Sequence, residues 1–437
     1  MGLAALQRAG RGGRPDGPRL CRRVLQPPGG EVAVERRARA PAARLGSAGV
    51  EPVAHEALSL GPVIDWLVAG APPARLPQEV LLELCRRLRA AGLPLYRVAV
   101  FVRTLHPNVL GRGFIWHETT DKVEITEAAY DFLQSDQYLQ SPIRTIFTGQ
   151  GELRRRLAEP ACPMDFPILQ DFRNEGVTDF LGLPLPFVSG EVHAASFATR
   201  RAEGFTAHEL AALREVARPL ARLAEIYALM RKSRNILEAY LGRQTGEKVL
   251  EGHIRRGDGE EIHAVIWFCD LRDSTMLADS MSRAEFLQLL NEFFECALSP
   301  VLARGGEVLR FIGDAALAIF PVDGNEAEAC RRAVQAAQDA RGCMDAANAS
   351  RERPLAFGIG LHMGDVLYGN IGTPTRIEFT VIGAAANEAA RIEALCKTLG
   401  VPLILSAPVA RHVPGCRPLG RHRLRGVGEA LELFTLE

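Results

Sequence analysis

Two carboxylates in the C-terminal half of the chain each follow a short apolar run. Asp270 ends the run HAVIWFCD, and Asp314 follows Gly313 between the runs EVLRFI and AALAIF. Short runs rich in Val, Ile and Phe predict buried strands, and a Gly-Asp pair between two such runs predicts a two-residue hairpin turn. We therefore expect each carboxylate to stand at the end of a strand, where both can face one cleft.

Such a pair of carboxylates suits hard divalent cations. Two carboxylates brought together repel each other unless a cation lies between them, and Mg²⁺ and Mn²⁺ prefer oxygen ligands. Two-metal sites clamp the attacking and the leaving oxygen in phosphoryl and nucleotidyl transfer. Taken singly, each residue also has an ordinary explanation, because Asp270 can cap the following helix and Asp314 can serve the turn.

Alternating strand and helix patterns surround these two residues. Ser282 and Glu285 form a capping box that predicts a helix start, and further helices are expected over 325–348 and 384–399. Between them lie the strand-like runs LAFGIGLH, VLYGNIG and EFTVIG, with a turn expected at the tripeptide MGD that begins at Met363. The order β-α-ββ-α-ββ-α predicts an α+β domain, a ferredoxin-like or palm-like antiparallel sheet with its helices on one face.

Four segments in this part of the chain resemble the catalytic domain of class III adenylyl (adenylate) cyclases of the bacterial type. They are FCDLRDST, LRFIGDAALAIF, GIGLHMGDVLYGNIG and FTVIGAAANEAARIE. The resemblance extends from about Ile262 to Glu437, roughly two fifths of the chain. It implies an enzyme, a phosphorus-oxygen lyase, that converts ATP into 3′,5′-cyclic AMP and pyrophosphate by in-line attack of the ribose 3′-hydroxyl on the α-phosphate.

The resemblance also assigns roles around the two carboxylates. It implies that Asp270, Asp314 and the Leu271 carbonyl hold two Mg²⁺ (or Mn²⁺) ions per active site, one acting on the 3′-hydroxyl and the other on the triphosphate. The backbone N–H groups that follow, at a helix start, are expected to receive phosphate oxygens of the substrate. These N–H groups belong to Arg272, Asp273, Ser274 and Thr275.

A second set of residues comes from the end of the chain. In NEAAR, Asn387 and Arg391 lie four residues apart and therefore on one face of the predicted helix. By resemblance they orient the ribose and stabilise the charge at the α-phosphate, and Arg425 lies where the family usually has a Lys on the triphosphate. Without the resemblance, Asn387 and Arg391 would be an ordinary solvated pair and Arg425 one Arg of a basic run.

Two further positions bear on the choice of base. The family's adenine-selecting Lys aligns with Arg310, and its partner aligns with Thr380. A Thr is usual in bacterial-type adenylyl cyclases, whereas guanylyl cyclases have Glu and Cys at the two positions. The Arg is a departure, since Arg cannot mimic a compact ammonium group. The alternatives are therefore a guanylyl or mixed-base cyclase and a catalytically silent nucleotide-binding module. A diguanylate cyclase is set aside, because GGEVL at Gly305 is not that family's GGDEF signature.

The resemblance implies a homodimer. In this family each active site combines the metal-binding Asp residues of one catalytic domain with the Asn and Arg of another. This chain has one such domain, which carries both sets. A head-to-tail homodimer with active sites shared between chains is therefore expected.

The N-terminal half predicts a tail and a regulatory domain. Residues 1–55 are rich in Arg, Ala, Pro and Gly without periodicity, which predicts a disordered tail. Residues 56–205 mix helical and strand patterns, with a helix expected over 125–139 and a hairpin at Ser189-Gly190. This part resembles GAF-type sensor domains, and it implies regulation by a ligand or partner whose identity is unknown.

Residues 206–257 are expected to form a helical linker before the catalytic domain, residues 258–437. Thr206 and Glu209 form a capping box at its start. Apolar residues then follow the 3-4-3-4-3 spacing of an a/d seam, which predicts either a short parallel coiled coil or a single amphipathic helix on the sensor core. The seam consists of Leu213, Val216, Leu220, Leu223, Tyr227 and Met230.

Composition narrows the class of protein. The 437 residues are 47% hydrophobic and have a formal net charge of zero, which is ordinary for a globular protein and does not indicate a nucleic-acid partner. The nine Cys form no CxxC pairs, which favours reduced thiols, and the scattered His106, His117, His193 and Cys162 support no haem or metal site. No apolar run reaches the ~18 residues of a membrane span, so we expect a cytoplasmic protein without membrane insertion.

Overall fold

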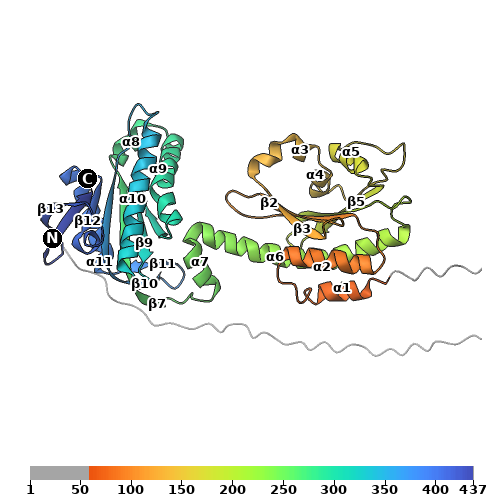
Figure 1. Cartoon of the computed structure of the whole chain (residues 1–437), viewed down its shortest axis with the longest axis horizontal. Helices are drawn as coiled ribbons and strands as arrows, with labels where there is room; N and C mark the ends of the chain where they lie inside the picture. Colours follow the sequence, from red (N-terminus) through yellow and green to blue (C-terminus); the bar gives the residue numbers. More distant parts are fainter. Residues whose placement is uncertain (1–58, 437) are drawn as a thin grey trace, which may run out of the picture. The chain divides into compact units, whose positions relative to one another are not determined.

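The computed structural model describes residues 59–436 (Figure 1). The tail predicted over 1–55 lies outside the described residues. Within the described part, one sheet is built from residues 97–199 and a second from residues 259–436. Along the chain, helices α6 and α7 connect the N-terminal domain to the C-terminal domain.

The N-terminal domain is built on a six-stranded antiparallel sheet in the order β3-β2-β1-β6-β5-β4. Helices α1, α2 and α6 cover one face, where Leu84 and Leu213 pack with Val98 and Phe197, and the shorter helices lie over the other face (Figure 1). The strands are β1 (Arg97–Arg103), β2 (Gly111–His117), β3 (Lys122–Ala128), β4 (Leu153–Arg155), β5 (Asp179–Pro186) and β6 (Val192–Thr199). The helices are α1 (Gly61–Val68), α2 (Pro77–Ala90), η1 (Tyr130–Gln134), α3 (Asp136–Leu139), α4 (Pro142–Phe147), α5 (Pro167–Asn174) and α6 (Ala207–Leu241).

Two predictions for this domain have different outcomes. The hairpin at Ser189-Gly190 is confirmed, because β5 and β6 pair antiparallel on either side of it. The helix expected over 125–139 is wrong in its first part, where β3 pairs with β2, and only η1 and α3 follow. The sequence KVEITEA alternates apolar and polar residues, which is the period of a strand with one covered face.

Helix α6 begins at the predicted capping box. The Thr206 hydroxyl accepts a hydrogen bond from the Glu209 backbone at 3.2 Å, and the Glu209 carboxylate accepts one from the Thr206 backbone at 2.7 Å. The seam residues from Leu213 to Leu223 are buried in the core of the N-terminal domain, whereas Met230 is 64% exposed. The first four seam residues are therefore not available to a coiled coil. Of the two alternatives, the single amphipathic helix is right for this part of α6.

The C-terminal domain contains an eight-stranded sheet in the order β13-β14-β12-β10-β7-β9-β8, with β11 paired to β10. All neighbouring strands are antiparallel except β10 and β12, so the expected antiparallel α+β fold is confirmed. The strands are β7 (Gly259–Leu271), β8 (Glu307–Ile312), β9 (Ala315–Pro321), β10 (Phe357–Gly372), β11 (Ile377–Ile382), β12 (Leu403–Ser406), β13 (Cys416–Arg423) and β14 (Ala430–Leu436). The helices are α7 (Arg243–Leu250), α8 (Ser274–Ser280), α9 (Arg283–Ala303), α10 (Glu326–Asn348), α11 (Ala384–Leu399) and α12 (Ala407–Ala410).

The helices of this domain lie on both faces of the sheet, which corrects the expectation of a single helical face. Along β7, Val265 and Trp267 pack with α9 and α10, whereas Ala264 and Ile266 pack with α11. Successive residues of a strand point to opposite faces, so β7 is covered on both sides. Helical periodicity predicts that α11 forms, but it does not tell which face of the sheet the helix covers.

The turn expected at Met363 is also wrong. Strand β10 continues through this tripeptide, and Gly364 pairs with Ala264 of β7. A Cβ on Gly364 would lie 2.9 Å from the Cβ of Ala385 in α11. The glycine therefore allows α11 to approach the strand closely and does not serve a turn.

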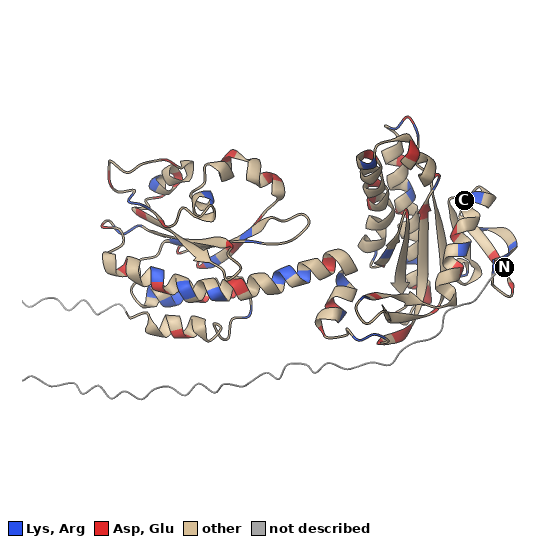
Figure 2. Ribbon diagram, turned by 180° about the vertical axis from the view of Figure 1, so that it is seen from behind, with Lys and Arg blue, Asp and Glu red and all other residues tan. Residues whose placement is uncertain are grey.

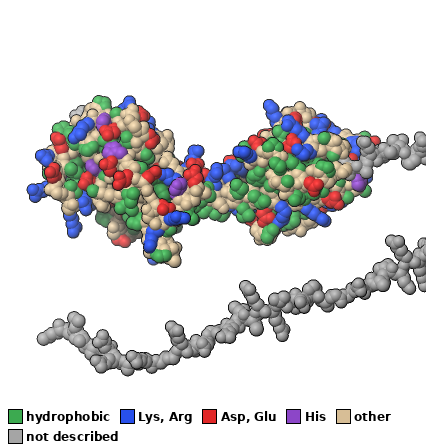
Figure 3. Space-filling model, turned by 90° about the horizontal axis from the view of Figure 1, so that it is seen from below, with side chains coloured by type: hydrophobic (Ala, Val, Ile, Leu, Met, Phe, Trp, Pro, Cys, Tyr) green, Lys and Arg blue, Asp and Glu red, His purple; other side chains and the backbone are tan. Residues whose placement is uncertain are grey.

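The described surface carries both signs of charge. Several Lys and Arg residues lie along α6 (Figure 2). On the face drawn in Figure 3, basic and acidic side chains are interspersed with apolar ones. Among residues 59–436, no helix is long and apolar enough to cross a membrane.

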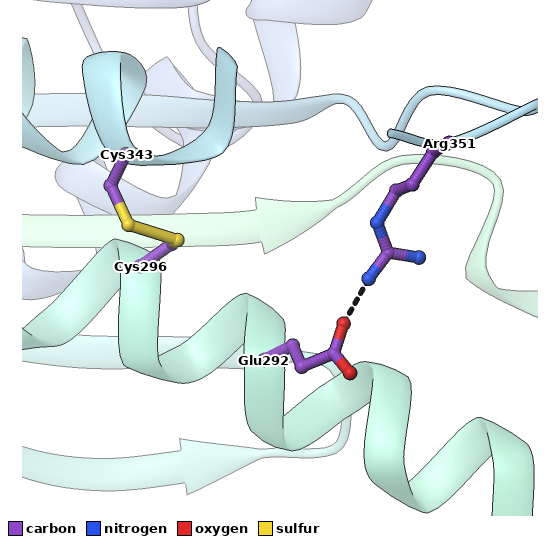
Figure 4. Close-up of a disulfide and its surroundings, with 4 residues drawn as sticks. All are labelled: Glu292, Cys296, Cys343 and Arg351. Carbon is purple, nitrogen blue, oxygen red and sulfur yellow. Dashed lines mark hydrogen bonds and ion pairs between the residues drawn. A yellow bond between two sulfur atoms is a disulfide. The ribbon is translucent and has the colours of Figure 1, made fainter. Parts of the chain in front are cut away.

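One pair of cysteines departs from the expectation of reduced thiols. Cys296 of α9 and Cys343 of α10 form a disulfide, with Cα atoms 5.3 Å apart (Figure 4). Near the disulfide, Glu292 of α9 forms an ion pair with Arg351, which follows the end of α10. The two cysteines are 47 residues apart in the sequence and meet only because α9 and α10 pack side by side, which the spacing of the Cys residues does not reveal.

Candidate active site

The two carboxylates singled out in the sequence lie at one end of the sheet. Asp270 is the penultimate residue of β7 and pairs with Ala315, the residue after Asp314. The Leu271 backbone N–H donates to the Asp314 carbonyl at 3.3 Å. Gly313 has φ of +65°, as the predicted hairpin turn requires. The structure therefore brings Asp270, Leu271 and Asp314 together as expected.

The electrostatics of this pair fit a bound cation. Burial raises the pKa of Asp270, and the neighbouring Asp314 carboxylate raises it further, while Arg272 acts in the opposite direction. A divalent ion between the two carboxylates would relieve this repulsion, and carboxylate oxygens are suitable ligands for Mg²⁺ or Mn²⁺. Residues 59–436 contain no group of three or more His, Cys, Asp or Glu side chains able to hold a metal. The remaining coordination positions would therefore fall to backbone, substrate and water oxygens.

Arg272 has a role that its place in the motif did not suggest. Its Nη2 lies 2.7 Å from Oε1 of Glu393 in α11, and the two side chains are 16% and 4% exposed. Burial raises the pKa of Glu393 to about 7, and Arg272 opposes that rise. Gly358 of β10 makes room for the pair, because a Cβ there would collide with both side chains. Glu393 was missed from the sequence, although a carboxylate among the buried positions of α11 is a signal in itself.

The Arg272 backbone does not fit the predicted contact with phosphate. Its N–H donates to the Ala356 carbonyl at 2.8 Å and is therefore already in use. The next three residues, Asp273, Ser274 and Thr275, open helix α8, whose first N–H groups have no acceptor within the helix. The carboxylate of Asp273 accepts a hydrogen bond from the Lys397 ammonium at 3.1 Å.

The two positions that bear on base choice lie on β8 and β11, which are not paired in the sheet but approach each other. Arg310 of β8 forms an ion pair with Glu378 of β11, with Nη2 and Oε2 2.5 Å apart. Thr380, two residues further along β11, is 4% exposed, and its hydroxyl has no hydrogen-bond partner within residues 59–436. An unpaired buried hydroxyl is costly unless another group satisfies it, so Thr380 offers a hydrogen bond to a ligand.

The second predicted set gathers around the exposed side of α11. Asn387 is exposed, and its side-chain amide donates to the Gly383 carbonyl at 3.4 Å. Arg391 points toward the turn that contains Arg425, because a Cβ on Gly426 would lie 3.6 Å from Nη2 of Arg391. Neither Arg391 nor Arg425 forms an ion pair within the described residues. Both guanidinium groups are thus free to bind phosphate oxygens.

The carboxylate pair and this second set are not joined within one chain. No hydrogen bond or ion pair between residues 59 and 436 links Asp270 or Asp314 to Asn387, Arg391 or Arg425. The buried side of α11, with Ala389 and Glu393, faces the sheet, whereas Asn387 and Arg391 lie on its other side. The structure therefore places all of these residues in one domain but keeps them in two groups.

Comparison with known proteins identifies this part of the chain. Residues 260–409 match the family model described as the adenylate and guanylate cyclase catalytic domain. This segment is a class III adenylate/guanylate cyclase catalytic domain. The resemblance inferred from the four motifs is confirmed for this domain, whereas the GAF-like character of the N-terminal domain remains a prediction.

Two relatives that are named adenylate cyclases are similar to part of the chain. The chain is 32% identical over 186 residues to an adenylate cyclase of Anabaena cylindrica, covering 39% of this chain and 36% of that protein. It is 29% identical over 176 residues to adenylate cyclase 1 of Rhizobium meliloti, covering 39% of this chain and 26% of that protein. The chain thus spans well under half of the length of these curated relatives. Among solved structures, a bacterial light-regulated adenylyl cyclase is 27% identical, with a TM-score of 0.43 over 50% of this chain and 64% of that one.

Proposed function

We propose that this chain is an adenylyl cyclase that converts ATP into 3′,5′-cyclic AMP and pyrophosphate. The observation that carries the proposal is the pair Asp270 and Asp314, brought to one end of the sheet in a cyclase catalytic domain. Two relatives named adenylate cyclase support ATP as the substrate. The unpaired hydroxyl of Thr380 supports a base-binding role for β11.

Each group of residues has a task in this reaction. Asp270 and Asp314 would hold two Mg²⁺ or Mn²⁺ ions, which supply the positive charge that favours the 3′-alkoxide and steadies the triphosphate. Asn387 orients the ribose, so that its 3′-oxygen lies in line with the α-phosphate. Arg391 and Arg425 bind phosphate oxygens whose negative charge grows as pyrophosphate leaves.

The reaction is a single displacement of pyrophosphate from the α-phosphorus by the ribose 3′-oxygen. The bond from the 3′-oxygen to the α-phosphorus forms as the bond from that phosphorus to the bridging oxygen breaks. Pyrophosphate leaves with the bonding electrons, and the hydroxyl proton passes to solvent. The amides of Asp273, Ser274 and Thr275, at the start of α8, are in the part of the domain that would receive the triphosphate.

A guanylyl or mixed-base cyclase is the second candidate. It is favoured by the ion pair between Arg310 and Glu378, because Glu378 adds a carboxylate two residues from Thr380. A carboxylate accepts hydrogen bonds from the N–H groups of guanine, which adenine lacks at the same positions. ATP and GTP therefore have to be compared directly.

The active site is proposed to be shared between two chains in a head-to-tail homodimer. Asn387 and Arg391 lie on the side of α11 that faces away from the sheet, whereas Asp270 lies in the sheet, which supports this arrangement, since the reaction needs both. Large apolar side chains are also exposed on strands β8, β10 and β11, which is typical of a surface that is covered by a partner. They are Phe311, Ile312, Leu367, Ile371, Ile377 and Ile382.

Product analysis tests the proposal. The purified chain is incubated with ATP or GTP and with Mg²⁺ or Mn²⁺, beside Asp270→Ala and the control Asp345→Ala, whose side chain is exposed on α10. Cyclic AMP from ATP that is lost in Asp270→Ala and retained in Asp345→Ala is the expected result. Cyclic GMP alone would favour the second candidate, and the absence of both products would contradict a cyclase.

A further inference from the structure

The N-terminal domain contains a partly open cavity of about 600 Å³. Its floor is the face of the sheet opposite α1, α2 and α6, and its roof is formed by η1, α3, α4 and α5 (Figure 1). The volume lies within the range of small-molecule sites in proteins. Gly113 of β2 lies on the floor, where a Cβ would come within 2.6 Å of the Thr126 hydroxyl and 3.0 Å of the Phe101 ring. The sheet is thus kept free of a side chain at this point.

Six aromatic side chains line the cavity. Phe101 and Ile115 line it from the sheet, while Tyr138, Phe147 and Phe172 line it from the helices. The rings of Phe172 and Phe180, both in the lining, stack with centroids 5.6 Å apart. Such walls favour a flat apolar molecule, because ring faces and edges pack well against another aromatic ring.

Two guanidinium groups of β1 also reach this lining. Arg97 and Arg103 are six residues apart on one strand and therefore point to the same face. The guanidinium of Arg103 lies 4.7 Å from the Phe147 ring centroid and donates a hydrogen bond to the Tyr138 hydroxyl at 3.2 Å. Its Nε is buried and has no hydrogen-bond partner among the described residues. The guanidinium of Arg97 lies 5.2 Å from the Phe172 ring centroid, and burial lowers its pKa.

The charges around the cavity differ at the two cations: Glu175 and Glu124 oppose the lowering of the pKa of Arg97, whereas Arg103 has no carboxylate partner among the described residues. Neither Arg97 nor Arg103 forms an ion pair within residues 59–436, whereas Arg112, also in the lining, is paired with Glu127 at 2.5 Å. The other carboxylates of the lining, Asp136 and Asp171, belong to exposed residues of the helices. A partly buried cation without a counter-ion is unfavourable, so the β1 side of the cavity is suited to an anion.

We propose that this cavity binds an aromatic carboxylate, with its rings between the aromatic side chains of the lining and its carboxylate on Arg103, whose buried Nε has no partner among the described residues. Guanidinium groups bind carboxylates through charge-assisted and often bidentate hydrogen bonds, which fits this placement. The site lies outside the cyclase domain. No residue assigned to catalysis takes part in it.

The position of the site also connects it to the helix that leads to the cyclase domain. The two residues after Arg103 accept hydrogen bonds from the buried Asn235 of α6, at 3.2 Å on the Thr104 hydroxyl and 3.1 Å on the Leu105 carbonyl. A ligand that fixes Arg103 therefore acts next to the contact between β1 and α6. A change in turnover on ligand binding follows from this contact, and that part of the inference rests on the proposed cyclase activity.

Calorimetry on the full chain with 2-naphthoate tests the site. We expect one molecule of naphthoate to bind per chain. The uncharged analogue 2-naphthamide should bind more weakly, by about tenfold or more, because the carboxylate is recognised by its charge. Arg103→Gln is expected to weaken naphthoate binding by a similar factor. Arg112→Gln is the matched control, since its guanidinium is already paired, and it is expected to change the affinity by less than about threefold.

Melting temperatures and the rate of cyclic nucleotide formation distinguish a failure of the site from a failure of the coupling or of the proposed function. Naphthoate is expected to raise the melting temperature of the wild type but not of Arg103→Gln, whose own melting temperature without ligand shows whether it is folded. No binding of naphthoate, or equal binding of naphthoate and naphthamide, would overturn the site. Binding without any change in the rate of cyclic nucleotide formation would overturn the coupling alone, whereas a chain that forms no product from ATP or GTP would refute the proposed function and leave the binding result standing.

Discussion

Replacing Tyr368 by Phe is expected to loosen helix α7 from the cyclase domain. The Tyr368 hydroxyl donates to Oε2 of Glu307 at 2.6 Å and lies 3.1 Å from the hydroxyl of Thr245 in α7. The Thr245 backbone and hydroxyl donate to Oε1 of Glu307 at 3.0 and 2.7 Å. All three residues are buried, and burial together with Glu307 raises the pKa of Tyr368, so its hydroxyl is protonated and acts as a donor.

The magnitude follows from the bond that is lost. A hydrogen bond to a charged group contributes about 1.5–3 kcal/mol, and Phe keeps the ring contact with Phe379, whose centroid is 4.6 Å away. In Tyr368→Phe, Oε2 of the buried Glu307 has lost its donor, and local opening of α7 would let water satisfy it. The amides of α7 should therefore exchange about 10- to 150-fold faster than in the wild type. The effect should be confined to α7 and the adjoining ends of β8 and β10.

Hydrogen–deuterium exchange of the full chain, read in peptides that cover 243–250, measures this change. Tyr240→Phe is the matched control, because Tyr240 lies on the preceding helix, is 85% exposed and makes no side-chain hydrogen bond within the described residues. Unchanged exchange of α7 in Tyr368→Phe, or the same acceleration in both variants, would refute the reasoning.

Two further predictions concern buried charge. Burial lowers the pKa of His193 from 6.5 to about 4, so between these values the unfolded chain binds more protons than the folded one. Stability of the N-terminal domain should therefore fall by on the order of 3 kcal/mol as the pH drops from 6.5 to 4, and urea unfolding of His193→Asn should show a flatter pH dependence. Glu393→Ala leaves the partly buried Arg272 without its partner and should lower the free energy of unfolding by about 3 kcal/mol. Lys397→Ala removes only the exposed contact with Asp273 and should cost less than about 1 kcal/mol, so equal losses in a urea titration would contradict this account.

Local signals in the sequence predicted most of the elements correctly. The capping boxes at Thr206 and Ser282 mark the starts of α6 and α9, because a cap depends on residues three positions apart. The hairpin at Gly313 and the helix over 384–399 also depend on short-range patterns, and both are present.

The features that were missed depend on contacts between distant parts of the chain. The face of the sheet that α11 covers, and the need for Gly364 beneath it, arise only when the helix packs on β10. The pairing of Arg272 with Glu393 joins residues 121 positions apart, and neither neighbourhood signals the other. The cavity of the N-terminal domain likewise has no sequence signature, since its walls come from strands and helices spread over the domain.

The most direct test of a shared active site combines two inactive variants. Asp270→Ala removes a residue of the carboxylate pair, and Arg391→Ala removes a residue of the other group. If each site takes one group from each chain, equal mixing of the two variants gives mixed dimers that contain one intact site. Cyclic AMP formation from ATP should then recover to about a quarter of the wild-type rate, as expected for random dimers. Two variants that remain inactive when mixed, although each binds ATP and forms dimers, would contradict an active site shared between chains.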